Sequence, residues 1–84
     1  MQDALFTELD VLTETANKLF DVACDIHNTP REELLATLGA IGRLTERANA
    51  LEDAGICTAY IVHMNKATRT CITNFILNGW KTGR

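Results

Sequence analysis

The sequence predicts an all-α protein, a three-helix antiparallel bundle formed by a single domain of 84 residues. Three observations predict it. Apolar residues recur at steps of three and four in three successive segments, a proline and a glycine separate these segments, and the last segment lacks a β-turn signal. A chain of this length buries only about 60% of its unfolded surface, so packing against a second copy would add stability. We therefore expect a homodimer that forms through helix–helix packing.

The first helix is expected over residues 2–27. Its apolar positions alternate by four and three and define one face, made of Leu5, Leu9, Leu12, Ala16, Leu19, Ala23 and Ile26. Phe6 and Phe20 widen this face on one side. Acidic residues such as Asp10 and Glu14 fall away from it and are expected to face solvent.

The second helix is expected over residues 30–54. Thr29 is a candidate N-cap, Pro30 suits the first helical position, and Glu32 follows Thr29 by three residues as in a capping box. Gly55 is suited to close the helix in a left-handed conformation. The apolar stripe consists of Leu34, Leu38, Ile41, Leu44 or Thr45, Ala48 and Leu51.

Two glycines, Gly39 and Gly42, interrupt this second helix. Each costs about 1 kcal/mol relative to alanine in a helix interior. We expect either close packing of a neighbouring helix at these glycines or a bend.

The third helix is expected over residues 56–78, followed by a short basic tail, 79–84. Its apolar face follows steps of three and four, and Asn78 and Gly79 are suited to end it; the face consists of Cys57, Tyr60, Met64, Ala67, Cys71 and Phe75. The alternative is a β-hairpin, favoured by the Thr and Ile content, but the intervening "NKATR" has no turn glycine. Further apolar residues broaden the helical face and indicate more than one neighbour: Ile61, Val62, Ile72 and Ile76.

Composition and cysteine usage indicate an ordinary globular protein of the cytoplasm. Apolar residues make up 46% and charged residues 23% of the chain, no apolar run reaches the roughly 20 residues of a membrane span, and no basic leader begins the sequence. Three cysteines, Cys24, Cys57 and Cys71, are expected to be reduced, buried thiols.

Charge is distributed unevenly along the chain, although the net charge is only −3. Residues 1–28 carry six acids and Lys18, whereas residues 56–84 carry four basic residues and no acid. We expect the basic end of the chain to attract the acidic first helix.

No catalytic, metal or cofactor site is expected. The chain contains no serine, and Cys24 with His27, or Cys57 and Cys71 with His63, lack the spacing of a metal site or of an activated nucleophile. No phosphate-binding glycine loop is present either. The protein is therefore predicted not to be an enzyme.

Two successive segments resemble helix-turn-helix DNA-binding motifs. In "ANALEDAGICTAYIVHM", Gly55 is similar to the turn glycine of that family, with Ile61 and Met64 as apolar anchors. The segment "KATRTCITNFILNG" is similar to the recognition helix of small phage-type repressors, with Thr68 as N-cap and Arg69, Thr70, Thr73 and Asn74 as polar reading residues. Both segments depart from the pattern of the family. The first has no basic residue before Lys66, and in the second Lys66 stands where a turn glycine is expected. A DNA-binding transcriptional regulator is thus the alternative function.

The main functional hypothesis is a small non-enzymatic protein-binding regulator or inhibitor that acts through helix-mediated contacts. Repeated apolar seams and a surplus of apolar surface favour such a role. The residues expected to contact the partner protein are Tyr60, His63, Lys66, Arg69, Thr73, Trp80 and Lys81.

Overall fold

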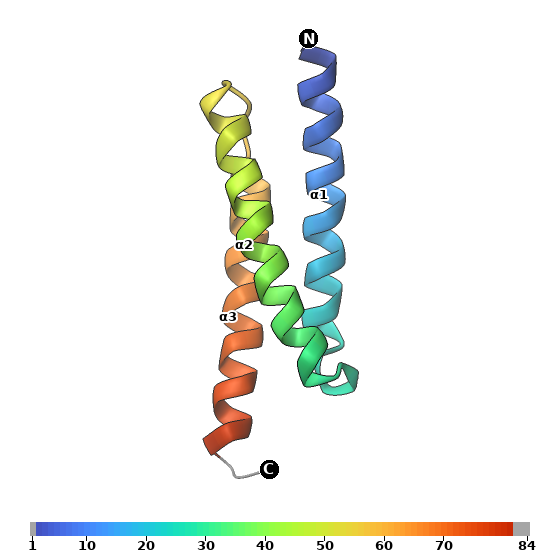
Figure 1. Cartoon of the computed structure of the whole chain (residues 1–84), viewed down its shortest axis with the longest axis vertical. Coiled ribbons are helices and arrows are strands. Elements are labelled where there is room, and N and C mark those ends of the chain that lie inside the picture. The colour runs from blue at the N-terminus through green and yellow to red at the C-terminus, as the bar shows by residue number, and fades with distance from the viewer. Residues whose placement is uncertain (1, 82–84) are drawn as a thin grey trace.

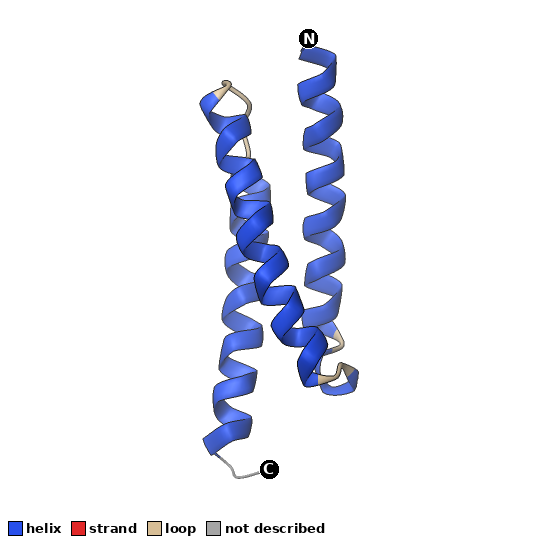
Figure 2. Cartoon of the chain, in the orientation of Figure 1, coloured by secondary structure: helices blue, strands red, loops and turns tan. Residues whose placement is uncertain are grey.

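The computed structural model describes residues 2–81, in which three long helices form a bundle and no strand is present (Figure 1, Figure 2). The helices are α1 (Gln2–Cys24), α2 (Arg31–Asp53) and α3 (Ala59–Lys81). They run down, up and down, so α1 and α3 are parallel and α2 is antiparallel to both. The three-helix bundle is confirmed, and the hairpin alternative for the last segment is excluded. Side chains are described for residues 4–78.

The face predicted for α1 is confirmed, but the helix ends earlier than residue 27. Leu12, Ala16 and Ala23 are buried, and the acidic face is exposed. After Cys24 the chain tightens into a 3₁₀ turn, η1 (Ile26–Asn28). Asn28 Nδ2 donates a hydrogen bond to Asp25 Oδ1 at 2.8 Å, which stabilises this turn.

The start of α2 differs from the predicted capping box. The Thr29 hydroxyl donates to the backbone carbonyl of Asp25 at 2.8 Å, toward α1 and not toward α2. Pro30 itself caps the helix, because its carbonyl accepts the first backbone N–H groups, from Glu33 and Leu34. A proline restricts the residue before it to the extended backbone region, so Thr29 is the C-cap residue of the preceding turn, η1.

The predicted end of α2 is confirmed as a Schellman motif. Gly55 has a positive φ of 90°, and its N–H donates to the carbonyl of Glu52 at 2.9 Å. The N–H of Ile56 donates to the carbonyl of Leu51 at 3.0 Å. Ile56 also packs on the cluster that contains Leu51, the apolar contact that accompanies this motif.

The face predicted for α3 is correct only in part. Met64, Ala67 and Phe75 are half-buried, and Met64 and Phe75 pack on the core clusters, but the fully buried positions lie on the adjacent stripe. The buried positions are Thr58, Ile61, Asn65, Thr68 and Ile72, whereas Cys57, Tyr60 and Cys71 of the predicted face are exposed. Three of the five buried residues are polar, which is why hydrophobicity alone selected the wrong stripe. Thr68 is tolerated there because its hydroxyl bonds within the helix, where Thr68 Oγ1 donates to the carbonyl of Met64 at 2.9 Å. Thr58 Oγ1 is buried without a hydrogen-bond partner among the described residues.

The ends of α3 also differ from prediction. The helix begins at Ala59 and continues through Gly79 to Lys81, so residues 79–81 belong to the helix and not to a tail. Thr68 lies in the middle of this helix and is 1% exposed, so it is not an N-cap and no separate recognition helix begins there. The remainder of the predicted tail, 82–84, lies outside the described residues.

The core forms two clusters along the bundle axis. One joins the first half of α1 to the second half of α2 and the start of α3, through Leu12, Ala16, Leu44, Ala48, Leu51 and Ile61. The other lies near the α1–α2 connection and contains Ala23, Ile26, Leu34 and Ile72. The stripe predicted for α2 supplies both clusters, so that prediction is confirmed.

Neither α2 glycine is required by close packing. A Cβ atom at Gly42 would have no atom of another residue within 4 Å, and one at Gly39 would meet only the Arg43 side chain, at 3.6 Å. The expectation of a neighbouring helix packed closely on these glycines is therefore wrong.

Candidate protein-interaction surface

The expected partner-binding residues separate into two groups on α3. Tyr60 lies on the side of α1, where its hydroxyl donates to Asn17 Oδ1 at 2.6 Å. Lys66 and Arg69 line a groove between α2 and α3. The structure therefore does not bring the whole predicted set together.

His63 lies on the outer surface of α3, where it lines a shallow hollow that includes Lys66 but not Arg69. Thr73 is half-buried. Trp80 and Lys81 belong to α3 by backbone, but their side chains lie outside the described residues, so their expected contact role stays a prediction. Trp80 was expected to follow the helix, and this was wrong.

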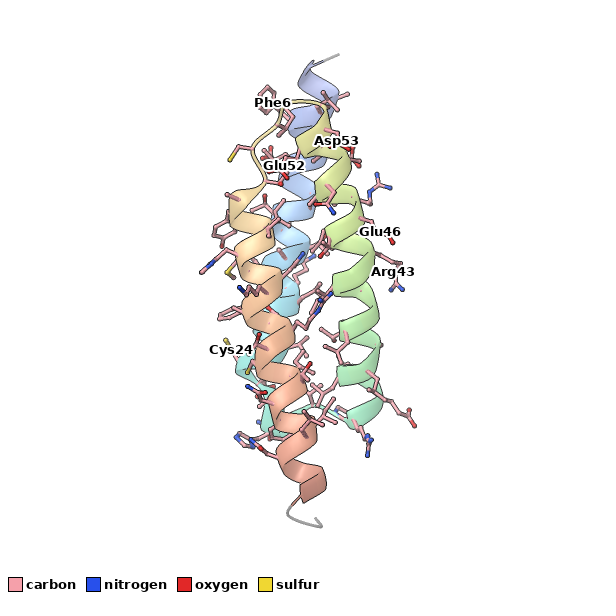
Figure 3. All side chains as sticks on the ribbon, turned by 90° about the vertical axis from the view of Figure 1, so that its left-hand side faces the viewer. Phe6, Cys24, Arg43, Glu46, Glu52 and Asp53 are labelled. Atoms are coloured by element: carbon pink, nitrogen blue, oxygen red, sulfur yellow. The ribbon has the colours of Figure 1, made fainter. Side chains whose placement is uncertain are left out.

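The groove between α2 and α3 has a volume of about 360 Å³. Figure 3 shows the two helices side by side, with α1 behind them. Residues of both helices line the groove: Ile41, Thr45, Val62, Asn65, Lys66, Arg69 and Thr70. Apolar side chains therefore stand next to two basic side chains at the same surface.

A hydrogen-bond chain joins the two helices at this groove. Asn65 Nδ2 donates to Thr45 Oγ1 at 3.2 Å, and the Thr45 hydroxyl donates to the carbonyl of Ile41 at 2.8 Å. Because the Thr45 proton is already engaged, Thr45 can only accept from Asn65, which fixes the orientation of the amide. Asn65 is 3% exposed, and its Oδ1 has no hydrogen-bond donor among the described residues.

Large apolar side chains extend this surface along α3. Val62 is 41% exposed and Leu77 is 54% exposed, and both share a helical stripe with Lys66, Arg69 and Thr73, at steps of four and three. Sequence reasoning did not select Val62, Leu77 or Asn65 as site residues. The signal that reveals Val62 and Leu77 is a second seam beside the buried one, whereas Asn65 lies on the buried seam itself.

The described charges do not pair as expected between the ends of the chain. Among residues 4–78, the ion pair found joins Glu8 of α1 to Arg47 of α2. The acids of α1 and the bases of α3 make no such contact in that range, so the expected attraction is not realised as an ion pair there. Lys66 and Arg69 are exposed.

The thiols are exposed and not buried as expected. Cys24, Cys57 and Cys71 are all free and exposed, and Cys71 Sγ lies 4.0 Å from the carbonyl oxygen of Ala23. Within the described part of the chain, no group of three or more His, Cys, Asp or Glu side chains is arranged to hold a metal ion.

Comparison of the chain with protein-family models, with curated proteins and with solved structures found no match. In the described part of the chain, none of the helices combines the length and apolar character that a membrane span requires.

Proposed function

We propose that this protein is a small non-enzymatic regulator or inhibitor of the cytoplasm that acts by binding another protein. The observation that carries the proposal is the exposed stripe of α3, in which Val62 and Leu77 flank Lys66 and Arg69 beside a groove. Exposed apolar side chains mixed with basic ones are typical of protein-binding surfaces.

Charge reversal of the groove tests this function. The double variant Lys66→Glu, Arg69→Glu should lose its partner in affinity capture from the native host, because both exposed bases lie where the partner is expected to bind. The matched control is Lys18→Glu, Arg43→Glu, which makes the same charge change at exposed positions of α1 and α2. Figure 3 shows Arg43 pointing away from α3. Equal capture by both variants would remove the basic stripe from the proposal.

We also propose that the protein forms a homodimer. Phe6 of α1 is 51% exposed, which adds apolar surface away from the groove. Sedimentation at micromolar concentration is expected to give a dimer, and a stable monomer would refute this part of the proposal.

Duplex DNA is the competing ligand, and it predicts different behaviour. A DNA complex would weaken steeply with added salt, because phosphate neutralisation releases counterions. The lateral extents of the bundle, 18 and 16 Å, show that α2 and α3 lie lengthwise together and do not cross at the near-perpendicular angle of a helix-turn-helix. We expect a low-salt gel shift to show no complex, and a salt-sensitive complex would favour the DNA alternative.

A further inference from the structure

Helices α2 and α3 each carry a second seam next to the one that they bury in the core. On α3 it consists of Val62, Lys66, Arg69, Thr73 and Leu77. On α2 it consists of Leu35, Gly42, Thr45 and Asn49, together with Leu38, which also packs on the core and so belongs to both seams. Both sets follow steps of three and four, the spacing of residues that pack against one neighbouring helix. Since α1 covers the core seams, the second seams are the ones available to a further helix.

The two seams meet at the groove, which is lined by Thr45 of the α2 seam and by Val62, Lys66 and Arg69 of the α3 seam. The bond from Asn65 to Thr45 sets the relative level of the helices. Because α2 and α3 are antiparallel, Leu35, ten residues before Thr45, is level with the residue ten after Asn65, close to Leu77. Leu35 is 49% exposed and Leu77 is 54% exposed, so this end of the surface is apolar.

The other end of this surface is apolar at Val62, and Lys66 and Arg69 make its middle basic. Val62 and Leu77 are fifteen residues apart in the sequence, or about 22 Å along a helix, which corresponds to about four turns of a docked partner helix. Lys66 and Arg69 lie between them. Gly42, on the facing seam, leaves space because a Cβ there would meet no atom within 4 Å.

The basic residues at the groove indicate the charge of the partner that would bind there. Residues 56–84 contain no acid, and no ion pair to Lys66 or Arg69 is found among the described residues. A carboxylate placed between these two bases supplies the missing counter-charge.

We propose that the groove between α2 and α3 receives an acidic amphipathic helix of the partner protein, as the fourth helix of a four-helix packing. A central Asp or Glu of this helix lies between Lys66 and Arg69. Apolar residues toward its two ends pack on Val62 and on the pair Leu35 and Leu77. This inference rests on the proposed function and names the partner's binding element.

Selection from a displayed library of helical peptides tests the inference without knowledge of the partner. Peptides enriched on the wild-type protein should carry an acid flanked by apolar residues at helical spacing. Enrichment of peptides without that pattern, or no binder at about 100 μM, would overturn the inference.

Two exposed valines then provide a matched pair of variants for the enriched peptide. Val62→Glu places a carboxylate in the groove, one turn before Lys66. This carboxylate forms an ion pair with the Lys66 ammonium group and repels the acidic residue of the peptide. Val11→Glu makes the same change on exposed α1, away from the groove. We expect Val62→Glu to weaken binding by about tenfold and Val11→Glu to change it less than about twofold. Circular dichroism of both variants should be that of the wild type.

The same titration separates this inference from the proposed function. If Lys66→Glu, Arg69→Glu loses the peptide while Val62→Glu retains it, the bases bind a partner but the groove does not hold a helix. If all variants bind equally, both ideas fail. If the wild type self-associates and Val62→Glu does not, the groove holds a second copy of this chain, and the proposed occupant is wrong.

Discussion

Replacing Asn65 by leucine should stabilise the free protein. Asn65 is 3% exposed, and its Oδ1 has no donor among the described residues, a situation that costs about 1–3 kcal/mol. Leucine removes this cost and adds buried apolar surface, worth about 1.5–3 kcal/mol for a full side chain. The groove of about 360 Å³ at this position offers room for the branched side chain.

The opposing contribution is one neutral hydrogen bond. The 3.2 Å contact from Asn65 Nδ2 to Thr45 Oγ1 is lost, at about 1 kcal/mol, while the Thr45 hydroxyl keeps its bond to the Ile41 carbonyl. The net expectation for Asn65→Leu is a gain of about 2 kcal/mol in the free energy of unfolding. For a domain of this size that corresponds to a rise of about 10 °C in Tm, measurable by circular dichroism with urea unfolding as a second readout.

A double-mutant cycle with Thr45→Val checks the reasoning. Thr45→Val alone leaves Asn65 Nδ2 without its acceptor and should destabilise the protein by about 1–2 kcal/mol. In the Asn65→Leu background the same change should cost about 1 kcal/mol less, because the amide is gone. A lower Tm for Asn65→Leu would show that its oxygen is satisfied in solution, and a coupling energy of zero would show that the bond to Thr45 does not form.

Two further predictions concern the backbone and the described ion pair. Gly42→Ala should stabilise α2 by about 0.5–1 kcal/mol, since a Cβ there meets no atom within 4 Å. Gly55→Ala should destabilise the folded protein by about 1–2 kcal/mol, since the φ of Gly55 is +90°. Thermal unfolding of both variants checks the opposite signs, and a shift in the same direction would contradict the assignment. Arg47→Ala should change the unfolding free energy by less than about 1 kcal/mol, because its ion pair with Glu8 is exposed. A larger loss in urea denaturation would mean that the pair is more rigid than its exposure suggests.

Much of the fold was predictable from local patterns. The apolar spacing on α1 and α2 identified their buried faces, and Gly55 identified the end of α2, because a positive φ is a property of the residue itself. The capping box failed because Pro30, and not Thr29, is the N-cap residue of α2, and the Thr29 hydroxyl donates to the carbonyl of Asp25 in the preceding turn. Local sequence does not determine with which nearby backbone group a threonine hydroxyl forms its hydrogen bond.

The candidate site was predictable only in part. Lys66, Arg69 and Thr73 were selected because they form a polar stripe without acids, and the structure places the two bases at the groove. Leu77 was missed, and Val62 was recognised only as extra apolar surface and not as a site residue, since an apolar residue on a helix looks like core until its neighbours are known. Tyr60 was selected together with them, but its hydrogen bond to Asn17 places it on the other side of α3.

The sequence by itself determined that three helices form, that Gly55 ends α2, and that the apolar surface of α3 extends beyond one stripe. Only the tertiary structure decided which seam of α3 is buried, because burial depends on contacts with the other helices. Asn65, for example, lies in the interior, where its Nδ2 donates a hydrogen bond to Thr45 of α2. Periodicity is a property of one helix, whereas burial is a property of the contacts between helices. The same rotation that buries Thr58, Asn65 and Thr68 leaves Val62, Lys66 and Arg69 on the surface beside α2.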